Sequence, residues 1–437
     1  MAHDVTGMSL RCGKDAGPKL LGAGLRATVR RWARCAAMLG LSTASVAQEV
    51  LIPPQVPVPD TYFGMHFHRA TESTTVPRRG IGSWRLWDAR VAWRYLDPFG
   101  RGLNFAPLDR LVSLARQREI DLVYTFGATP EWASARPTEK GPYGAGSAAE
   151  PARLDDWQDY VTRIGRRYKG VIKNYELWNE PNGGFFTGSV PALVEMSCAA
   201  ASTLRQIDPA VVIISPSGIG HYPKPLQWLR EYLDAGGGAC VDVIGWHFYA
   251  PQGTPESVLG TIGVIRTIMR EHGAGDKPLW STEAGWRLAL GNSNAPAIDP
   301  KWPKLDAEKS EAYIARALLV GWAAGLSRYY YYAWDHRDMG FVTESGQVTA
   351  SASAFLTMRE WMLGAVVHSC KPHGANWICH LQRGTTGIVI AWRETGDAAP
   401  WQPEPGFTSV TALDGSTSTL AARQAIMLGT RPVRLSP

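Results

Sequence analysis

The chain has 437 residues, of which 45% are hydrophobic and 19% are charged, so it can bury a large core and does not belong to the disordered class. Most of its formal charge of +6 lies at the start, because residues 1–47 carry seven Lys or Arg and two acidic residues. The remainder has a net charge of about +1, which excludes the basic face that nucleic-acid binding requires.

Residues 1–47 are expected to form an export segment. A basic cluster at residues 26–34 precedes a short apolar run at 35–46, and small residues at 45–47 resemble a cleavage site. The apolar run is too short to cross a bilayer. We therefore expect an exported protein, periplasmic or secreted, without a stable membrane span. The alternative is a disordered basic N-terminus.

Four cysteines follow this segment, too few for a disulfide-dense scaffold. Cys370 and Cys379 flank a short segment with Pro and Gly and could pair in an oxidising compartment. Cys198 lies in a helical pattern and is expected to be buried. The sequence contains no Cys-x-x-Cys pair, which excludes a zinc ribbon.

Strand and helix patterns alternate between residues 60 and 363. The predicted strands are residues 60–68, 83–88, 120–126, 171–178, 211–215, 241–249, 278–282 and 328–334. Helices are predicted between most of them, and Leu108, Leu111, Val112 and Ala115 show the spacing of one amphipathic helix. Eight such units predict an α/β fold, a (β/α)8 TIM barrel whose active face lies at the C-terminal strand ends. An open doubly wound sheet is the alternative, but no glycine-rich phosphate loop follows a strand.

From about residue 371 the pattern changes to short strands at 377–381, 387–393, 408–413 and 425–428, separated by Gly, Pro and Asp-Gly turns. The sequence therefore predicts three parts: an export segment (1–47), a catalytic barrel (48–370) and a C-terminal β-sandwich accessory domain (371–437).

Two predicted strands end in a glutamate with aromatic neighbours. Glu180 lies in the WNEP motif at residues 178–181, where Pro181 cannot continue a sheet ladder. Glu283 follows Thr282 at the end of the seventh strand. Because the C-terminal ends of barrel strands meet at one face, we expect the two carboxylates to share one site. The chain also has 18 Trp, a residue that can stack on flat ligands such as sugar rings.

These motifs resemble those of the retaining glycoside hydrolases of clan A, which are (β/α)8 barrels. The stretches GMHFH (64–68) and WRLWD (84–88) look most like family 39 and the related exopolysaccharide-associated endoglycosidases. The resemblance covers residues 60–370, and the C-terminal module is similar to the one that family 39 enzymes carry. It implies cleavage of a β-linked polysaccharide, for example a bacterial exopolysaccharide, by double displacement without metal or cofactor.

By this resemblance Glu180 is the acid/base and Glu283 the nucleophile. Retaining hydrolysis needs the two carboxyl groups about 5–5.5 Å apart. Apolar neighbours such as Trp178, and repulsion from Glu283, would raise the pKa of Glu180. The alternative is that each glutamate caps a following helix or pairs with an arginine.

Other side chains are expected to line the substrate site. Asn179 would bind the sugar 2-OH, unless it only forms a turn before Pro181. Arg85 lies mid-strand and needs a carboxylate partner, for which Glu283 is expected and Asp88 or Asp335 are the alternatives. The resemblance implies that Tyr249 supports the nucleophile and that Trp334 forms the floor beneath the reacting sugar. The full substrate-binding set is Asn179, Arg85, His247, Tyr249, Trp334, His66, His68, Trp132 and Trp286.

Two other function classes are considered. A metal-dependent amidohydrolase barrel would use His66, His68, His247 and Asp335, but no His ends the fifth strand and no Lys lies at the required place on the fourth. A polysaccharide-binding protein with an inactive carboxylate pair is the third possibility. The expected partner is a polysaccharide or oligosaccharide, with no nucleic acid, and a monomer is expected.

Overall fold

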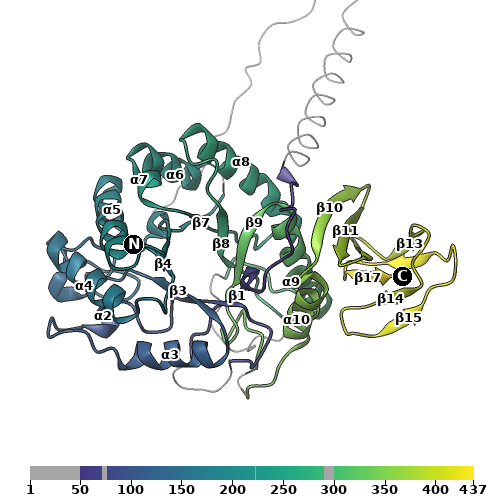
Figure 1. Ribbon diagram of the computed structural model, residues 1–437, viewed down its shortest axis with the longest axis horizontal. Coiled ribbons are helices and arrows are strands. Elements are labelled where there is room, and N and C mark those ends of the chain that lie inside the picture. The colour runs from purple at the N-terminus through teal and green to yellow at the C-terminus, as the bar shows by residue number, and fades with distance from the viewer. Residues whose placement is uncertain (1–49, 71–75, 222, 290–299, 344) are drawn as a thin grey trace, which may run out of the picture. The chain divides into compact units, whose positions relative to one another are not determined.

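The computed structural model describes residues 50–70, 76–221, 223–289, 300–343 and 345–437. The expected export segment lies outside them. A parallel sheet curls around the centre of the first part of the fold, with helices on its outside (Figure 1). Its strands are β1 (Phe63–Met65), β2 (Ser83–Leu86), β3 (Asp121–Thr125), β4 (Asn174–Glu176), β5 (Val212–Ile214), β6 (Gly218–Ile219), β7 (Ile244–His247), β8 (Leu279–Ala284) and β9 (Leu326–Tyr331).

The sheet order β5-β4-β3-β2-β1-β9-β8-β7-β6 follows the chain around the barrel. The fifth predicted strand, residues 211–215, forms β5, and a short additional strand, β6, follows it. Parallel bridges between Asn179 and Ser217 and between Ile214 and Val243 join the two ends of this order. The predicted (β/α)8 barrel is therefore confirmed.

The helices alternate with these strands. They are α2 (Trp93–Leu96), α3 (Ala106–Gln117), α4 (Leu154–Arg167), α5 (Val190–Ile207), α6 (Lys224–Asp234), α7 (Gly237–Cys240), α8 (Val258–Glu271), α9 (Ala307–Ala323) and α10 (Ala350–Met362), with the 3-10 turns η1 (Asp60–Tyr62), η2 (Glu131–Ala133), η3 (Pro181–Gly183) and η4 (Pro255–Ser257). The four apolar positions that predicted α3 are all buried. No helix in the described part of the chain has both the length and the apolar character that a bilayer span needs.

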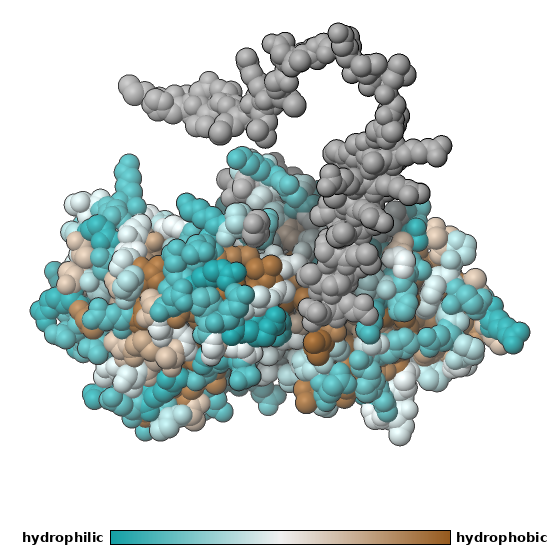
Figure 2. Space-filling model, turned by 90° about the horizontal axis from the view of Figure 1, so that it is seen from above, coloured by the Kyte–Doolittle hydropathy of each residue, from teal (hydrophilic) through white to brown (hydrophobic). Residues whose placement is uncertain are grey.

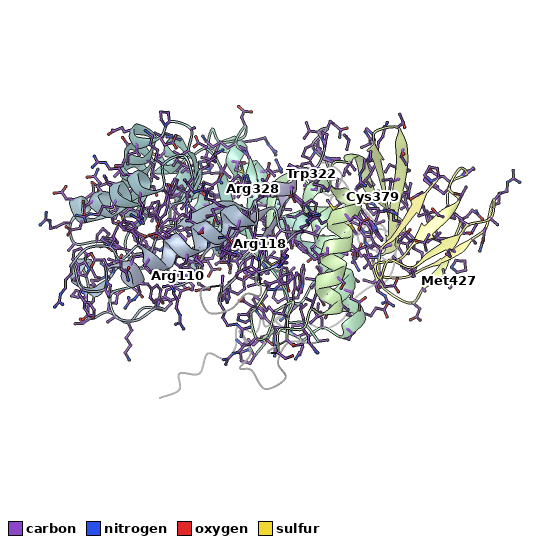
Figure 3. The ribbon with its side chains drawn as sticks, turned by 60° about the horizontal axis from the view of Figure 1, so that its bottom comes forward. Arg110, Arg118, Trp322, Arg328, Cys379 and Met427 are labelled. Atoms are coloured by element: carbon purple, nitrogen blue, oxygen red, sulfur yellow. A yellow bond between two sulfur atoms is a disulfide. The ribbon has the colours of Figure 1, made fainter. Side chains whose placement is uncertain are left out.

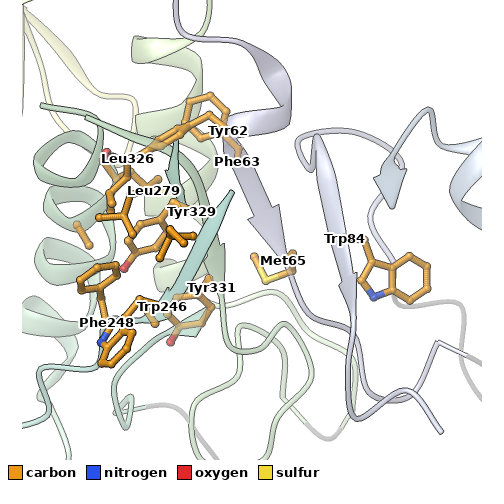
Figure 4. Packing of buried hydrophobic residues seen from close by; sticks show 14 of the residues in the cluster. Tyr62, Phe63, Met65, Trp84, Trp246, Phe248, Leu279, Leu326, Tyr329 and Tyr331 are labelled. Atoms are coloured by element: carbon orange, nitrogen blue, oxygen red, sulfur yellow. Dashed lines mark hydrogen bonds between the residues drawn. The ribbon is translucent and has the colours of Figure 1, made fainter. Parts of the chain in front are cut away.

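The core has two layers. Inside the barrel, Val123, Ile214, Trp280 and Tyr330 pack together from different strands. Gly64 makes room for Tyr330, because a Cβ at Gly64 would lie only 2.4 Å from that ring. Between the strands and the helices lies a larger apolar layer, part of which Figure 4 shows. On the face drawn in Figure 2, hydrophilic residues predominate and hydrophobic ones form small separate areas.

The C-terminal residues form antiparallel sheets, as predicted. One sheet has the order β10-β11-β12-β17-β14-β15, and β13 pairs with β16. The bounds are β10 (Val366–His373), β11 (Asn376–Arg383), β12 (Thr386–Arg393), β13 (Ala399–Trp401), β14 (Ser409–Thr411), β15 (Thr417–Thr419), β16 (Ile426–Leu428) and β17 (Val433–Ser436). The expected boundary between residues 370 and 371 falls inside β10, and the described residues from 50 onward form one compact unit.

Two disulfides connect neighbouring elements. Cys370 and Cys379 join β10 to β11, as the sequence allowed, and Cys379 is labelled in Figure 3. The expectation for Cys198 was wrong, because Cys198 is only partly buried and pairs with Cys240, which joins α5 to α7. A helical pattern gives the face on which a cysteine lies, but not a partner 42 residues further along the chain.

Candidate active site

The two motif glutamates meet at the C-terminal ends of the barrel strands. Glu180 follows β4 and begins η3 with left-handed backbone angles (φ 39°, ψ 55°), whereas Glu283 lies on β8. One carboxylate oxygen of each glutamate and one ring nitrogen of His247 lie within 4.8 Å of one another. This spacing suits a nucleophile and an acid/base on either side of one glycosidic bond.

Arg85 connects this pair to the barrel wall. It lies on β2, is completely buried, and donates through all three guanidinium nitrogens. Nη1 donates to Glu283 (2.6 Å), Nη2 to the Asn179 side-chain oxygen (2.7 Å) and Nε to Glu176 (2.5 Å). Glu283 is therefore the partner that the sequence predicted for Arg85, and neither alternative aspartate is.

Glu176 is a member of the cluster that sequence reasoning missed. It is buried on β4 and also accepts hydrogen bonds from Thr125 (2.6 Å) and Ser217. Thr282, next to Glu283, donates in turn to the Ser217 hydroxyl (2.7 Å). The available signal was a carboxylate in the middle of a strand expected to be buried, which needs a cation or several donors.

His247 and Tyr249 both face the glutamates, as their spacing on one strand predicted. The Tyr249 hydroxyl donates to Glu283 (2.8 Å). His247 Nδ1 lies 2.6 Å from Glu180 and 3.3 Å from Glu283. Burial lowers the pKa of His247 to about 4, although Glu283 opposes this shift, so the ring is neutral near pH 7.

Burial also raises the pKa of both glutamates, to about 7 in each case. His247 and Arg85 oppose the shift at Glu283, and Arg85 also opposes the shift at Glu180. Two such close carboxyls titrate as a pair, and the negative charge is favoured on the carboxyl that bonds directly to a cation and a hydroxyl donor. Arg85 and Tyr249 both bond directly to Glu283, so this geometry favours Glu180 as the carboxyl that keeps the proton.

The other predicted residues have different fates. His66 Nε2 donates a hydrogen bond to the Thr282 carbonyl oxygen (3.0 Å). The ring of His66 packs against Tyr332. The ring of His68 also packs against Tyr332, with 4.9 Å between centroids. Trp132, on η2, is 42% exposed and donates to the Asp97 carbonyl, so its role in an outer subsite stays a prediction.

Trp334 and Trp286 are almost completely buried. Trp334 is 2% exposed and packs against Phe67 and Phe341, while Trp286 is 1% exposed and donates to the Ala250 carbonyl. Trp334 lies beyond the end of β9 at Tyr331. Contact of either indole with a substrate stays a prediction.

A second group missed from the sequence surrounds Asp88, which directly follows β2 with φ 58°. Asp88 accepts the Tyr143 hydroxyl (2.5 Å) and the Tyr332 hydroxyl (2.7 Å). Tyr143 comes from the long loop after β3, and Tyr332 from the end of β9. The Asp in WRLWD was considered only as a partner of Arg85.

A cavity of about 380 Å³ adjoins the glutamate pair, with which it shares His247 and Tyr249. Gly220 and His221, after β6, line its other side, and the start of α8 closes it. Among the described residues, those that line it include no Asp, Glu, Lys or Arg. The cavity can therefore hold an uncharged group beside the carboxylates.

Among the described residues, the cluster with a geometry that could hold a metal ion is Glu180, His247 and Glu283. The Arg85 guanidinium at 2.6 Å from Glu283 opposes a second cation there. The four residues of the amidohydrolase alternative do not come together as such a group. Asp335 instead accepts the backbone N–H groups of His68 and Arg69, at 2.8 Å each.

No family model and no curated protein matches the sequence. Solved structures do match. A family 39 glycoside hydrolase from Bacteroides cellulosilyticus WH2 has a TM-score of 0.70 at 17% identity, covering 87% of this chain and 81% of that one. A monomeric beta-xylosidase from Caulobacter crescentus CB15 has a TM-score of 0.61 at 15% identity (88% and 98% covered). A GH39 enzyme from Xanthomonas axonopodis pv. citri has 0.59 at 14% (88% and 97%). The chain therefore has the fold of solved family 39 glycoside hydrolases.

Proposed function

We propose that this protein is a retaining glycoside hydrolase that cleaves a β-linked polysaccharide. The observation that carries the proposal is the pair of carboxyl groups, Glu180 and Glu283, within 4.8 Å and in unequal surroundings. Glu283 bonds to a buried arginine and a tyrosine hydroxyl, which favour its ionised form, and burial raises the pKa of Glu180 to about 7, which favours its protonated form near neutral pH. These are the two protonation states that double displacement requires at its start.

In the first step, Glu283 attacks the anomeric carbon while the bond to the leaving sugar breaks and Glu180 gives its proton to the leaving oxygen. Arg85 and Tyr249 fix the attacking carboxylate. In the second step, Glu180 takes a proton from water, and that water attacks the anomeric carbon and releases Glu283. Neutral His247, at 2.6 Å from Glu180, orients the acid without adding charge.

The fold neighbours support a β-linked substrate, since they include a beta-xylosidase and a GH30 endoxylanase from Clostridium papyrosolvens C71. The cavity shared with His247 and Tyr249 offers space for the leaving part of the chain. Export and action on a bacterial exopolysaccharide are part of this proposal. They fit a protein whose described residues contain two disulfides.

The experiment uses purified protein on polysaccharides and on 2,4-dinitrophenyl β-glycosides, with product stereochemistry read by NMR. Wild type should release a product that first appears as the β-anomer. Glu283→Gln should lose on the order of 10⁵-fold in kcat on all substrates, because no covalent intermediate can form.

Glu180→Gln separates the two roles. It should lose about 10²–10⁴-fold in kcat on polysaccharide. On dinitrophenyl glycosides, whose leaving group needs no proton, it should still show a burst of dinitrophenolate. Inverted product, or loss of wild-type activity in EDTA, would contradict the mechanism. Absence of turnover on every substrate would favour a binding protein.

A further inference from the structure

Asp88 joins three distant segments beside the glutamate pair. It follows β2, and its two carboxylate oxygens each accept one tyrosine hydroxyl, from Tyr143 in the loop after β3 and from Tyr332 after β9. Its φ of 58° is uncommon for a residue with a side chain, although Asp and Asn tolerate it. Asp88 is nevertheless only partly buried. The carboxylate is therefore held by both tyrosines and remains partly accessible.

The charge of Asp88 reaches the reacting groups. After burial itself, Asp88 is among the groups that raise the pKa of Glu180 and of Glu283. Burial, then Asp88, then Glu283 raise the pKa of both Tyr143 and Tyr332. Asp88 thus acts on the same small volume as the two glutamates.

This volume has an excess of negative charge. Glu176, Glu283 and Asp88 contribute carboxylates, and among the described residues the cation bonded to Glu176 and Glu283 is Arg85. Arg94 and Arg90 act with Asp88 on Tyr95, outside the bonds to the two glutamates. All three guanidinium nitrogens of Arg85 already donate to protein oxygens. A second carboxylate arriving on a substrate would find this guanidinium occupied and would be repelled.

Asp88 also keeps the capacity to accept further hydrogen bonds. Each carboxylate oxygen accepts two bonds readily, and one position on each is used by a tyrosine. Two neighbouring acceptors at fixed positions match two adjacent hydroxyl groups of a sugar ring. Hydrogen bonds to a charged acceptor are the stronger kind.

We propose that Asp88, fixed by Tyr143 and Tyr332, binds hydroxyl groups of the sugar whose bond is cleaved and makes the site select uncharged sugars over uronic acids. The inference rests on the proposed glycosidase function and assigns the substrate class of that site. Tyr143 and Tyr332 are positioning residues in it. Asp88 is the group that contacts the sugar.

The test compares matched 2,4-dinitrophenyl β-glycosides: glucoside with glucuronide, and galactoside with galacturonide. Within each pair only the group at C6 changes, from hydroxymethyl to carboxylate. Wild type should show a kcat/KM at least about 100-fold higher on the preferred uncharged member than on its acidic partner. That ratio corresponds to loss of charged hydrogen bonds together with repulsion.

Asp88→Asn removes the charge and tolerates the positive φ. It should lower kcat/KM on the uncharged glycoside about 10–100-fold, shrink the ratio within the pair at least tenfold, and move the pH optimum down. Tyr143→Phe keeps the Asp88 charge, so the ratio and the pH optimum should stay, although activity falls. Asp109→Asn is a matched control, because Asp109 also accepts a tyrosine hydroxyl (Tyr168, 2.9 Å) but lies on α3. Asp109→Asn should leave kcat/KM, the ratio within the pair and the pH optimum unchanged.

The outcomes are separable. Efficient hydrolysis of the acidic partner by wild type would overturn the inference and leave the proposed function standing. If folded Asp88→Asn kept the wild-type ratio and pH optimum, the role of Asp88 would be structural only. That result would also overturn the inference. Should that variant fail to fold in circular dichroism, the wild-type ratio still decides. No hydrolysis of any glycoside or polysaccharide would overturn the proposed function and this inference with it.

Discussion

Two buried arginines in this fold have the same chemistry and different consequences. Arg85 pairs with Glu176 and Glu283 at the strand ends, and Arg316 on α9 pairs with Glu256 of η4. Both arginines are fully buried. The Glu256 carboxylate is completed by Trp392 of β12, at 2.9 Å, so this second cluster fastens the C-terminal module to the barrel.

The difference lies in what each carboxylate does with its remaining oxygen. Both oxygens of Glu256 accept bonds from the structural partners Arg316 and Trp392. Glu283 gives one oxygen to Arg85, and its other oxygen meets Tyr249 and His247 beside the carboxyl of Glu180. A buried ion pair alone therefore does not show whether its role is structural or catalytic. An additional titratable group within reach, open to a cavity, is what favours catalysis.

Breaking the Arg85 cluster should have the largest effect on both stability and activity. Arg85→Met leaves Glu176 and Glu283 buried without a cation, which should cost about 3–5 kcal/mol in the free energy of unfolding. The kcat should fall about 10²–10³-fold, because the attacking carboxylate is no longer held. Urea unfolding and steady-state kinetics measure the two effects.

Arg85→Lys is the matched control for geometry. It keeps the charge but cannot make three directed bonds, so both effects should be intermediate. Wild-type kcat in a folded Arg85→Met protein would show that Arg85 has no part in holding the nucleophile.

Breaking the Arg316 cluster should affect stability alone. Arg316→Met leaves Glu256 buried without a cation and should again lower the free energy of unfolding by about 3–5 kcal/mol. The kcat of the folded protein, measured well below its melting temperature, should stay near that of wild type. Adding Glu256→Gln removes the uncompensated charge and keeps an acceptor for Trp392, so it should restore most of the loss. A fall in kcat like that of Arg85→Met would erase the distinction between the clusters.

The sequence was sufficient for the features that follow from period and direction. Alternating strand and helix patterns predicted the barrel, and parallel strands brought Glu180 and Glu283 to one face. A mid-strand arginine required a carboxylate, and Glu283 was the partner found. These inferences succeed because they depend on side chains whose direction the strand itself determines.

The rest depends on where strands end and how loops fold back. Tyr332 lies just beyond the end of β9 at Tyr331 and packs beside His66 and His68, a contact that the strand pattern did not indicate. The Asp88–Tyr143 bond spans 55 positions through a long loop, which no local pattern predicts. Cys198–Cys240 is similar, because the contact of α5 with α7 is a property of packing.

The proton on Glu180 should also affect the free energy of unfolding. Replacing Glu180 should raise this free energy, whereas the arginine substitutions lower it by a larger amount. Burial raises its pKa from 4.5 to about 7, so the folded state binds the proton more tightly than the unfolded chain does. The resulting stabilisation is complete below about pH 4.5 and is lost as pH rises through 7. Glu180→Gln cannot ionise, and it should gain about 1–3 kcal/mol relative to wild type between pH 5 and pH 8.

Urea unfolding of both proteins at the two pH values measures this gain. Glu139→Gln is a control of opposite sign, because the Thr187 hydroxyl and then Arg136 lower the pKa of the partly exposed Glu139. The stability of Glu139→Gln relative to wild type should therefore not increase as pH rises. A Glu180→Gln protein whose advantage does not grow with pH would mean that Glu180 is already ionised at pH 5. The acid of the first step would then be missing, and the contrast between a cluster built for structure and one kept ready for reaction would fail.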